Sequence, residues 1–145
     1  MAADNVLVFQ GTPVGGARAL YTYGGNTAGP RIVPGSATLP GGTVALNDAG
    51  DIALLEGQFA GSGTRLLLFR NGVTDTVLSA GDPLLGSTVS TIGFDPKGFN
   101  NSAQFALLVA LADGRDVFVL ASPVPEPGVA GVAVIVATSL LRRRR

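Results

Sequence analysis

Short apolar stretches separated by turn residues run along most of this chain, and none of them has the spacing of an amphipathic helix. The pattern divides the chain into similar units, and each unit opens on an Asn, Asp or Gly turn. The first strand of each unit is expected at residues 5–9, 52–55 and 105–111. Gly-rich loops lead to second strands at 19–23, 65–70 and 116–121. Third strands are expected at 31–33 and 74–79, the latter after the hairpin signal Asn71-Gly72, and fourth strands at 43–46 and 89–94.

The strand pattern repeats along the chain. At a spacing of 53 residues, Asn47, Ala53, Leu54 and Leu55 align with Asn100, Ala106, Leu107 and Leu108. At 46 residues, Gly11, Gly15 and Leu20 align with Gly57, Gly61 and Leu66, and at 45 residues the stretch 39–44 aligns with 84–89. The chain therefore holds two near-complete units and part of a third.

Repeated short antiparallel strands predict an all-β fold that is propeller-like but incomplete, with about two and a half units over residues 1–122. A closed propeller needs about four to eight blades, so this number of units cannot close. Its unclosed edges are expected to be exposed, which predicts either marginal stability or association through those edges.

A short motif opens the second and third units. Asn47, Gly50, Ala53 and Leu54 recur as Asn100, Ala106 and Leu107, with Ala103 in the place of the glycine. This motif is similar to that of the tandem-repeat proteins described by Asn-x-x-Gly-x-x-Ala-Phe, with Leu54 in the place of the aromatic residue. The resemblance implies a propeller-like β architecture without known catalysis, often with a sorting anchor. The residues themselves favour a folding role, because Asn bonds turn amides and Gly permits positive φ.

The character of the chain changes after residue 122. Residues 123–127 include Val124, Pro125, Glu126 and Pro127, which predict a stiff extended linker. Residues 128–141 carry no charge and predict a transmembrane helix, with Gly128, Val132, Ile135, Leu140 and Leu141 as anchor residues. The last four residues, Arg142, Arg143, Arg144 and Arg145, form a basic cytoplasmic tail that would retain the segment. At roughly 22 Å a helix over this run is a marginal span, and the alternative is a buried core strand or helix with a solvated basic tail.

This order of Pro-Glu-Pro, apolar segment and terminal Arg cluster resembles the PEP-CTERM protein-sorting signal of Gram-negative bacteria. The resemblance covers about the last 22 residues. It implies recognition by an exosortase, removal of the tail near Pro125-Glu126-Pro127, and delivery from the inner membrane to the cell surface or matrix. In this interpretation the N-terminal domain lies outside the cytoplasm, and Glu126 belongs to the signal.

Proteins with this signal should begin with a signal peptide, yet residues 1–9 have neither a basic n-region nor a long apolar stretch. In the first unit, the position of the motif asparagine falls on Met1. Both observations predict that the chain begins inside a longer protein.

Composition excludes most familiar enzyme chemistry. The 145 residues include no Cys and no His, so no thiol nucleophile, imidazole base or soft-ligand zinc site is expected. The formal net charge is zero, but without the four terminal arginines six cations face ten acids, giving about −4. A nucleic-acid surface is therefore not expected.

The remaining candidates for chemistry are turns. Asn47-Asp48-Ala49-Gly50-Asp51 and Asp113-Gly114-Arg115-Asp116 superficially resemble calcium loops, but they lack the six to eight oxygens of such a site. Asp82-Pro83 and Asp95-Pro96 are expected to cap turns.

Tyr21 and Tyr23 share one strand face, where they fill a core or flank a sheet edge, or else stack on sugar. The sequence thus favours a non-enzymatic exported protein without cofactor or metal. A polysaccharide- or protein-binding module is the alternative, and a hydrolase that uses two of the scattered acids comes third.

Overall fold

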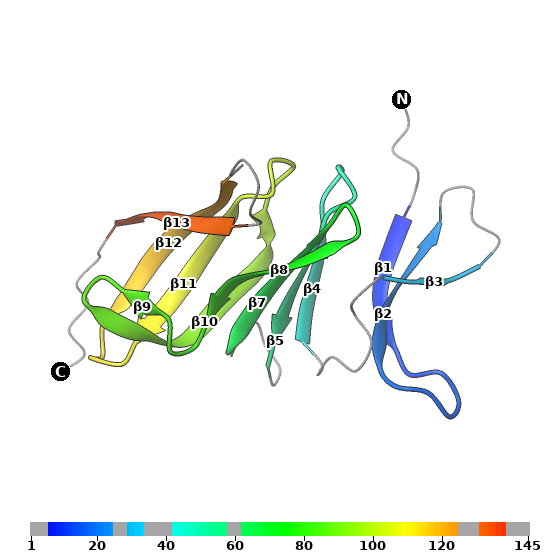
Figure 1. Cartoon of the computed structure of the whole chain (residues 1–145), viewed down its shortest axis with the longest axis horizontal. Helices are drawn as coiled ribbons and strands as arrows, with labels where there is room; N and C mark the ends of the chain where they lie inside the picture. Colours follow the sequence, from blue (N-terminus) through cyan, green and yellow to red (C-terminus); the bar gives the residue numbers. More distant parts are fainter. Residues whose placement is uncertain (1–5, 25–28, 34–41, 58–61, 125–130, 139–145) are drawn as a thin grey trace.

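The computed structural model describes residues 6–24, 29–33, 42–57, 62–124 and 131–138, and these residues form three antiparallel sheets (Figure 1). Sheet I contains β1 (Val6–Gly11), β2 (Ala19–Gly24) and β3 (Arg31–Ile32). Sheet II contains β4 (Gly42–Leu46), β5 (Ile52–Glu56), β7 (Arg65–Arg70) and β8 (Val73–Ser79). Sheet III contains β6 (Ser62–Gly63), β10 (Ser87–Phe99), β11 (Phe105–Leu111), β12 (Asp116–Val124) and β13 (Gly131–Thr138), and the short β9 (Pro83–Leu84) pairs with β10.

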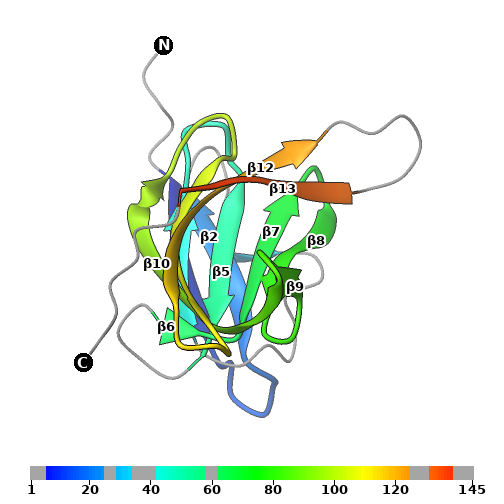
Figure 2. The same ribbon diagram turned by 90° about the vertical axis from the view of Figure 1, so that its left-hand side faces the viewer.

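The three sheets stand side by side in chain order, with sheet II in the middle (Figure 1). β1 lies against β4, and β4 lies against β10, so the sheets touch near their first strands. At the other edge β13 reaches β8 of sheet II (Figure 2). None of the three sheets closes on itself, and the part of the chain described here contains no helix. The expected all-β, antiparallel and open architecture is therefore confirmed.

The expected strands are present, but the repeat unit begins at a different point. The pattern predicts the strands at 43–46 and 89–94 as the last strands of a unit. In the structure β4 is instead the first strand of sheet II, and β10, which also pairs with the short β6, precedes β11 and β12 in sheet III. β4 pairs with the strand that follows it, joining Leu46 to Ile52 across a tight turn. β4 stays with β5, because a short turn keeps consecutive antiparallel strands together. The other side of β4 is therefore an edge of the sheet.

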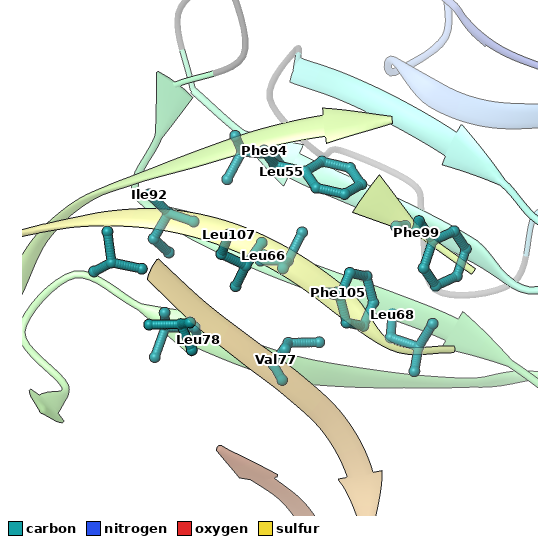
Figure 3. Close-up of a cluster of buried hydrophobic side chains, with 14 of the residues drawn as sticks. Leu55, Leu66, Leu68, Val77, Leu78, Ile92, Phe94, Phe99, Phe105 and Leu107 are labelled. Atoms are coloured by element: carbon teal, nitrogen blue, oxygen red, sulfur yellow. The ribbon is translucent and has the colours of Figure 1, made fainter. Parts of the chain in front are cut away.

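Sheet II is buried on both faces. Ala53, Leu55, Leu66 and Leu68 face sheet III, where Phe105 stacks on Phe99 with ring centroids 4.7 Å apart (Figure 3). The alternate residues of the same two strands, Ile52, Leu54, Leu67 and Phe69, face sheet I and contact Leu20 and Val33 there. Burial on both faces explains why β5 and β7 are almost continuously apolar instead of alternating.

The turns use the residues that the sequence singled out. Asn71 and Gly72 have φ of 51° and 77°, the positive values that a two-residue hairpin between β7 and β8 requires. The backbone amide of Ser79 donates to Asp82 Oδ2, and that of Lys97 donates to Asp95 Oδ1. Asp82 therefore stabilises a turn, as expected, whereas Asp95 and Pro96 lie within β10 at its bulge and not in a turn between strands.

The structure does not support the helix expected over residues 128–141. Residues 131–138 form β13, which pairs with β12 from Gly131↔Val124 to Thr138↔Phe118. Val132 and Ile135 are strand residues, and β-branched side chains of this kind favour strands. An uncharged run of this length does not distinguish a strand from a helix by its pattern, and the open edge of β12 offers it a partner.

Among the described residues, no helix has the length and apolar character needed to cross a membrane. Val124 is the last residue of β12, so the strand extends into the expected linker. Pro125, Glu126, Pro127, Gly128, Leu140, Leu141 and Arg142 to Arg145 lie outside the described residues.

Candidate functional site

The motif asparagine of sheet II joins two sheets. Asn47 is buried, and its Oδ1 accepts a hydrogen bond of 2.8 Å from the backbone amide of Asp51. Its Nδ2 donates to Asp51 Oδ2 at 3.1 Å and to the backbone carbonyl of Asn100 at 3.0 Å. One side chain therefore closes its own turn and also fixes the equivalent turn of the next unit.

The turn at Asn100 has the same form. Asn100 Oδ1 accepts from the backbone amides of Ser102 and Gln104, and its Nδ2 donates to Gln104 Oε1 at 2.8 Å. Ala103, which replaces the glycine, keeps the positive φ, at 57° compared with 86° at Gly50. The backbone conformation of the motif thus survives the loss of its glycine.

A second link joins residues separated by 53 positions. The backbone amide of Asp48 donates to Asn101 Oδ1 at 3.0 Å, and Asn101 Nδ2 donates back to Asp48 Oδ2 at 2.9 Å. The sequence repeat at this spacing is therefore also a physical contact between neighbouring sheets. The motif did not show this link, because Asp48 and Asn101 do not belong to its fixed positions.

The apolar motif residues are strand positions. Ala53, Leu54 and Leu107 are buried between sheets, whereas Ala106 is exposed on the outer side of sheet III. The apolar motif residues form packing contacts, and the asparagines stabilise the turns. The expected folding role of the motif agrees with both observations.

In each of the two turns that resemble calcium loops, at least one carboxylate binds a protein partner. Asp51 accepts from Asn47 and forms an ion pair with Arg70 at 3.4 Å. Asp113 accepts from Arg115, and this hydrogen bond lowers the pKa of the Asp113 carboxyl. Over the described ranges, no group of three acidic side chains is placed to hold a metal ion.

The sequence analysis missed an ion pair whose carboxylate is buried and whose guanidinium is partly exposed. Glu56 is buried at the end of β5, and both of its carboxylate oxygens accept from Arg65, the Nη2 bond measuring 2.8 Å. This hydrogen bond raises the pKa of the Arg65 guanidinium. A signal was present in the sequence, since an acid ends one apolar strand and a base begins the next. The pair joins the end of β5 to the start of β7.

Two of the hollows on the described surface lie near the sheets that carry the motif residues. The larger, of about 500 Å³, lies along β10 and β11 of sheet III next to Thr43 of sheet II, and it includes Leu108, Phe118 and a single acid, Asp95. The other, of about 400 Å³, lies between sheets I and II and includes Arg31 and Arg70 without any acid. Neither contains the two facing carboxylates that glycoside hydrolysis requires.

Aromatic side chains gather on the outer side of sheet I. Tyr21 stacks on Phe9 with ring centroids 5.6 Å apart, and Tyr23 is the neighbour two residues along. Leu7 pairs with Tyr23 across the two strands, and Ile32 pairs with Tyr21. The expected shared face of the two tyrosines is therefore present, and it is partly exposed.

Comparison with protein-family models, with curated proteins and with solved structures finds no match to this chain.

Proposed function

We propose that this chain is a non-enzymatic exported β-repeat protein whose C-terminal segment is a sorting signal of the PEP-CTERM type. One observation carries the proposal, namely the order of Val124-Pro125-Glu126-Pro127, an uncharged segment and four arginines at the end of the chain. The body of the protein is consistent with it, because the carboxylates of Asp51, Glu56 and Asp113 serve ion pairs and turns.

In this proposal the tail crosses the inner membrane, with the body outside the cytoplasm and the arginines inside. An exosortase then cleaves near Pro125-Glu126-Pro127, and the body reaches the cell surface or the extracellular matrix. Strand β13 and a membrane helix are two alternative states of the same apolar residues, because in lipid a lone segment satisfies its backbone only as a helix. Cleavage would remove β13 and leave the edge of β12 open.

The test is the intact mass of the chain expressed behind a functional signal peptide, in a host with an exosortase and in the same host without it. We expect loss of the segment around residues 125–145 only when the enzyme is present. Glu126→Gln should abolish this loss, whereas the matched control Asp95→Asn, which removes one negative charge from an exposed bulge, should not. An unchanged mass in both hosts would contradict the proposal.

A second candidate function is polysaccharide binding through the row of Phe9, Tyr21 and Tyr23, since aromatic rings stack on sugars. The mutual stacking of Phe9 and Tyr21 already covers one face of each ring, which leaves less ring surface for a glycan. Retention of the chain on immobilised polysaccharide, lost in Tyr23→Ala, would favour this candidate.

A further inference from the structure

Each sheet of this molecule has two faces, and the repeat shows what should cover each face. In sheet II, the cross-strand pair Leu55–Leu66 faces sheet III and is 1% and 0% exposed. The opposite face carries Leu54–Leu67 and Ile52–Phe69, which are covered by sheet I. We call the face of a sheet that points toward the next sheet in the chain its following face. The face that points toward the previous sheet in the chain is its preceding face.

The following face of sheet III is open. Leu108 pairs with Phe118 at the place that Leu55–Leu66 holds in sheet II, but these two side chains are 46% and 53% exposed. Ala106 and Leu120 lie beside them on the same face. The hollow of about 500 Å³ described above lies here. We call Ala106, Leu108, Phe118 and Leu120 the sheet III open face.

The preceding face of sheet I is open in the same way. Phe9–Tyr21 and Leu7–Tyr23 are the cross-strand pairs that correspond to Leu54–Leu67 and Ile52–Phe69. In sheet II these residues are buried, whereas Leu7 is 63% and Tyr23 is 48% exposed. We call Leu7, Phe9, Tyr21, Tyr23 and Ile32 the sheet I open face.

We propose that the two open faces dock on each other between two copies of this chain, head to tail, so that sheet I of each copy covers sheet III of the other. The reason for a second copy as the occupant is the repeat itself. Within one chain, the following face of sheet II is covered by the preceding face of sheet III, and a following face meets a preceding face again in the proposed contact. Clustered exposed apolar side chains of this kind mark association surfaces.

The two open faces differ from each other, so each contact joins unlike faces, and two copies related by a two-fold axis make both contacts at once and close into a ring. The described residues of two copies of this 145-residue chain supply six sheets, within the about four to eight blades of closed propellers. We therefore assign a ring of two copies. This inference does not depend on the sorting signal, and it replaces the expected association through strand edges by association through sheet faces.

Sedimentation velocity of the full 145-residue chain tests the proposal. The wild type should form dimers. Variant A (Leu108→Glu with Phe118→Thr) and variant B (Leu7→Glu with Tyr23→Thr) should each be monomeric, with Kd raised at least roughly tenfold. The control Val14→Glu, an equally apolar and fully exposed residue in the β1–β2 connection, should remain dimeric.

Mixing the variants distinguishes the head-to-tail contact from a symmetric one. An A and B mixture keeps one intact contact, between sheet III of B and sheet I of A, so mixed dimers should reappear. Variant B alone remaining dimeric would show that sheet III faces pair with each other, and would overturn the proposal. A wild-type chain that stays monomeric at millimolar concentration would overturn it as well.

A covalent readout keeps the proposal testable if a variant folds poorly. The chain contains no cysteine, so single substitutions report one contact without background. Under mild oxidation, a mixture of Leu108→Cys and Phe9→Cys chains should cross-link faster than either variant alone. Equal rates for the mixture and for each single variant would contradict the head-to-tail arrangement.

Discussion

Sheets II and III are built from the same repeat, yet they bury it differently. Leu54 and Leu55 of sheet II are both buried, because a sheet covers each face. At the equivalent positions of sheet III, Leu107 is buried and Leu108 is exposed. The difference shows that position in the stack, and not residue type, decides how deeply an apolar residue of this repeat is buried.

The largest expected effect compares those two equivalent leucines. Leu55→Ala should lower the free energy of unfolding by about 2–5 kcal/mol, because it leaves a cavity in the core between sheets II and III. Leu108→Ala should cost less than about 1 kcal/mol in the monomer. Urea unfolding at low protein concentration measures both, and equal losses would contradict the comparison.

A smaller effect is expected at the link between the two motif turns. Asn47→Ala removes three hydrogen bonds of a buried side chain, including the one to Asn100, and should cost about 2–3 kcal/mol. Asn101→Ala removes only exposed bonds to Asp48 and should cost less than about 1 kcal/mol. Thermal unfolding followed by circular dichroism ranks the two variants. If Asn101→Ala cost more, the exposed link would be the one that joins the sheets.

The two turns also differ in their tolerance of a side chain. Gly50 has φ of 86° and open space around it, so Gly50→Ala should cost about 1 kcal/mol through backbone strain alone. Ala103→Gly should be nearly neutral, because relief of the same strain offsets the loss of a buried methyl group, each about 1 kcal/mol. Chemical denaturation of both variants tests this, and a strongly destabilising Ala103→Gly would show that packing dominates.

The smallest effect concerns the exposed turn between β11 and β12. The hydrogen bond from Arg115 lowers the pKa of the Asp113 carboxyl, so the folded state holds this proton less tightly than the unfolded state. The stabilisation that the Asp113–Arg115 hydrogen bond gives is therefore present above the ordinary aspartate pKa. It is lost as the pH falls through the lowered pKa of Asp113 in the folded state. NMR titration should find an Asp113 pKa below the ordinary value in the wild type, and Arg115→Ala should bring it back. An unshifted wild-type pKa would contradict the contact.

The strands could be predicted from the sequence because turn residues delimit apolar stretches, as Asn71-Gly72 does between β7 and β8. The 53-residue repeat could be predicted as well, and Asn47 with Asn100 turned out to touch. The strand at which the repeat unit begins could not be predicted, since a strand pattern does not say on which side a strand pairs. The Glu56–Arg65 pair was missed because strand pairing brings the two residues together across nine positions.

The segment after β12 shows the limit of pattern analysis most clearly. An uncharged run that contains Val132 and Ile135 satisfies the composition of a membrane helix and also that of a buried strand. The structure has the strand, paired with β12. Which state the segment adopts in the cell depends on lipid and on the exosortase step proposed above, and neither is encoded in its periodicity.

The central claim is that the outer faces of sheets I and III are repeat contacts that no other sheet of the described residues covers. Hydrogen exchange of the full chain at two protein concentrations tests it most directly. The account predicts that β5 and β7 exchange slowly at both concentrations, while β1 and β2 exchange quickly in dilute solution and slowly in concentrated solution. If β1 and β2 exchanged as slowly as β5 and β7 in dilute solution, with no dependence on concentration, the claim would be contradicted.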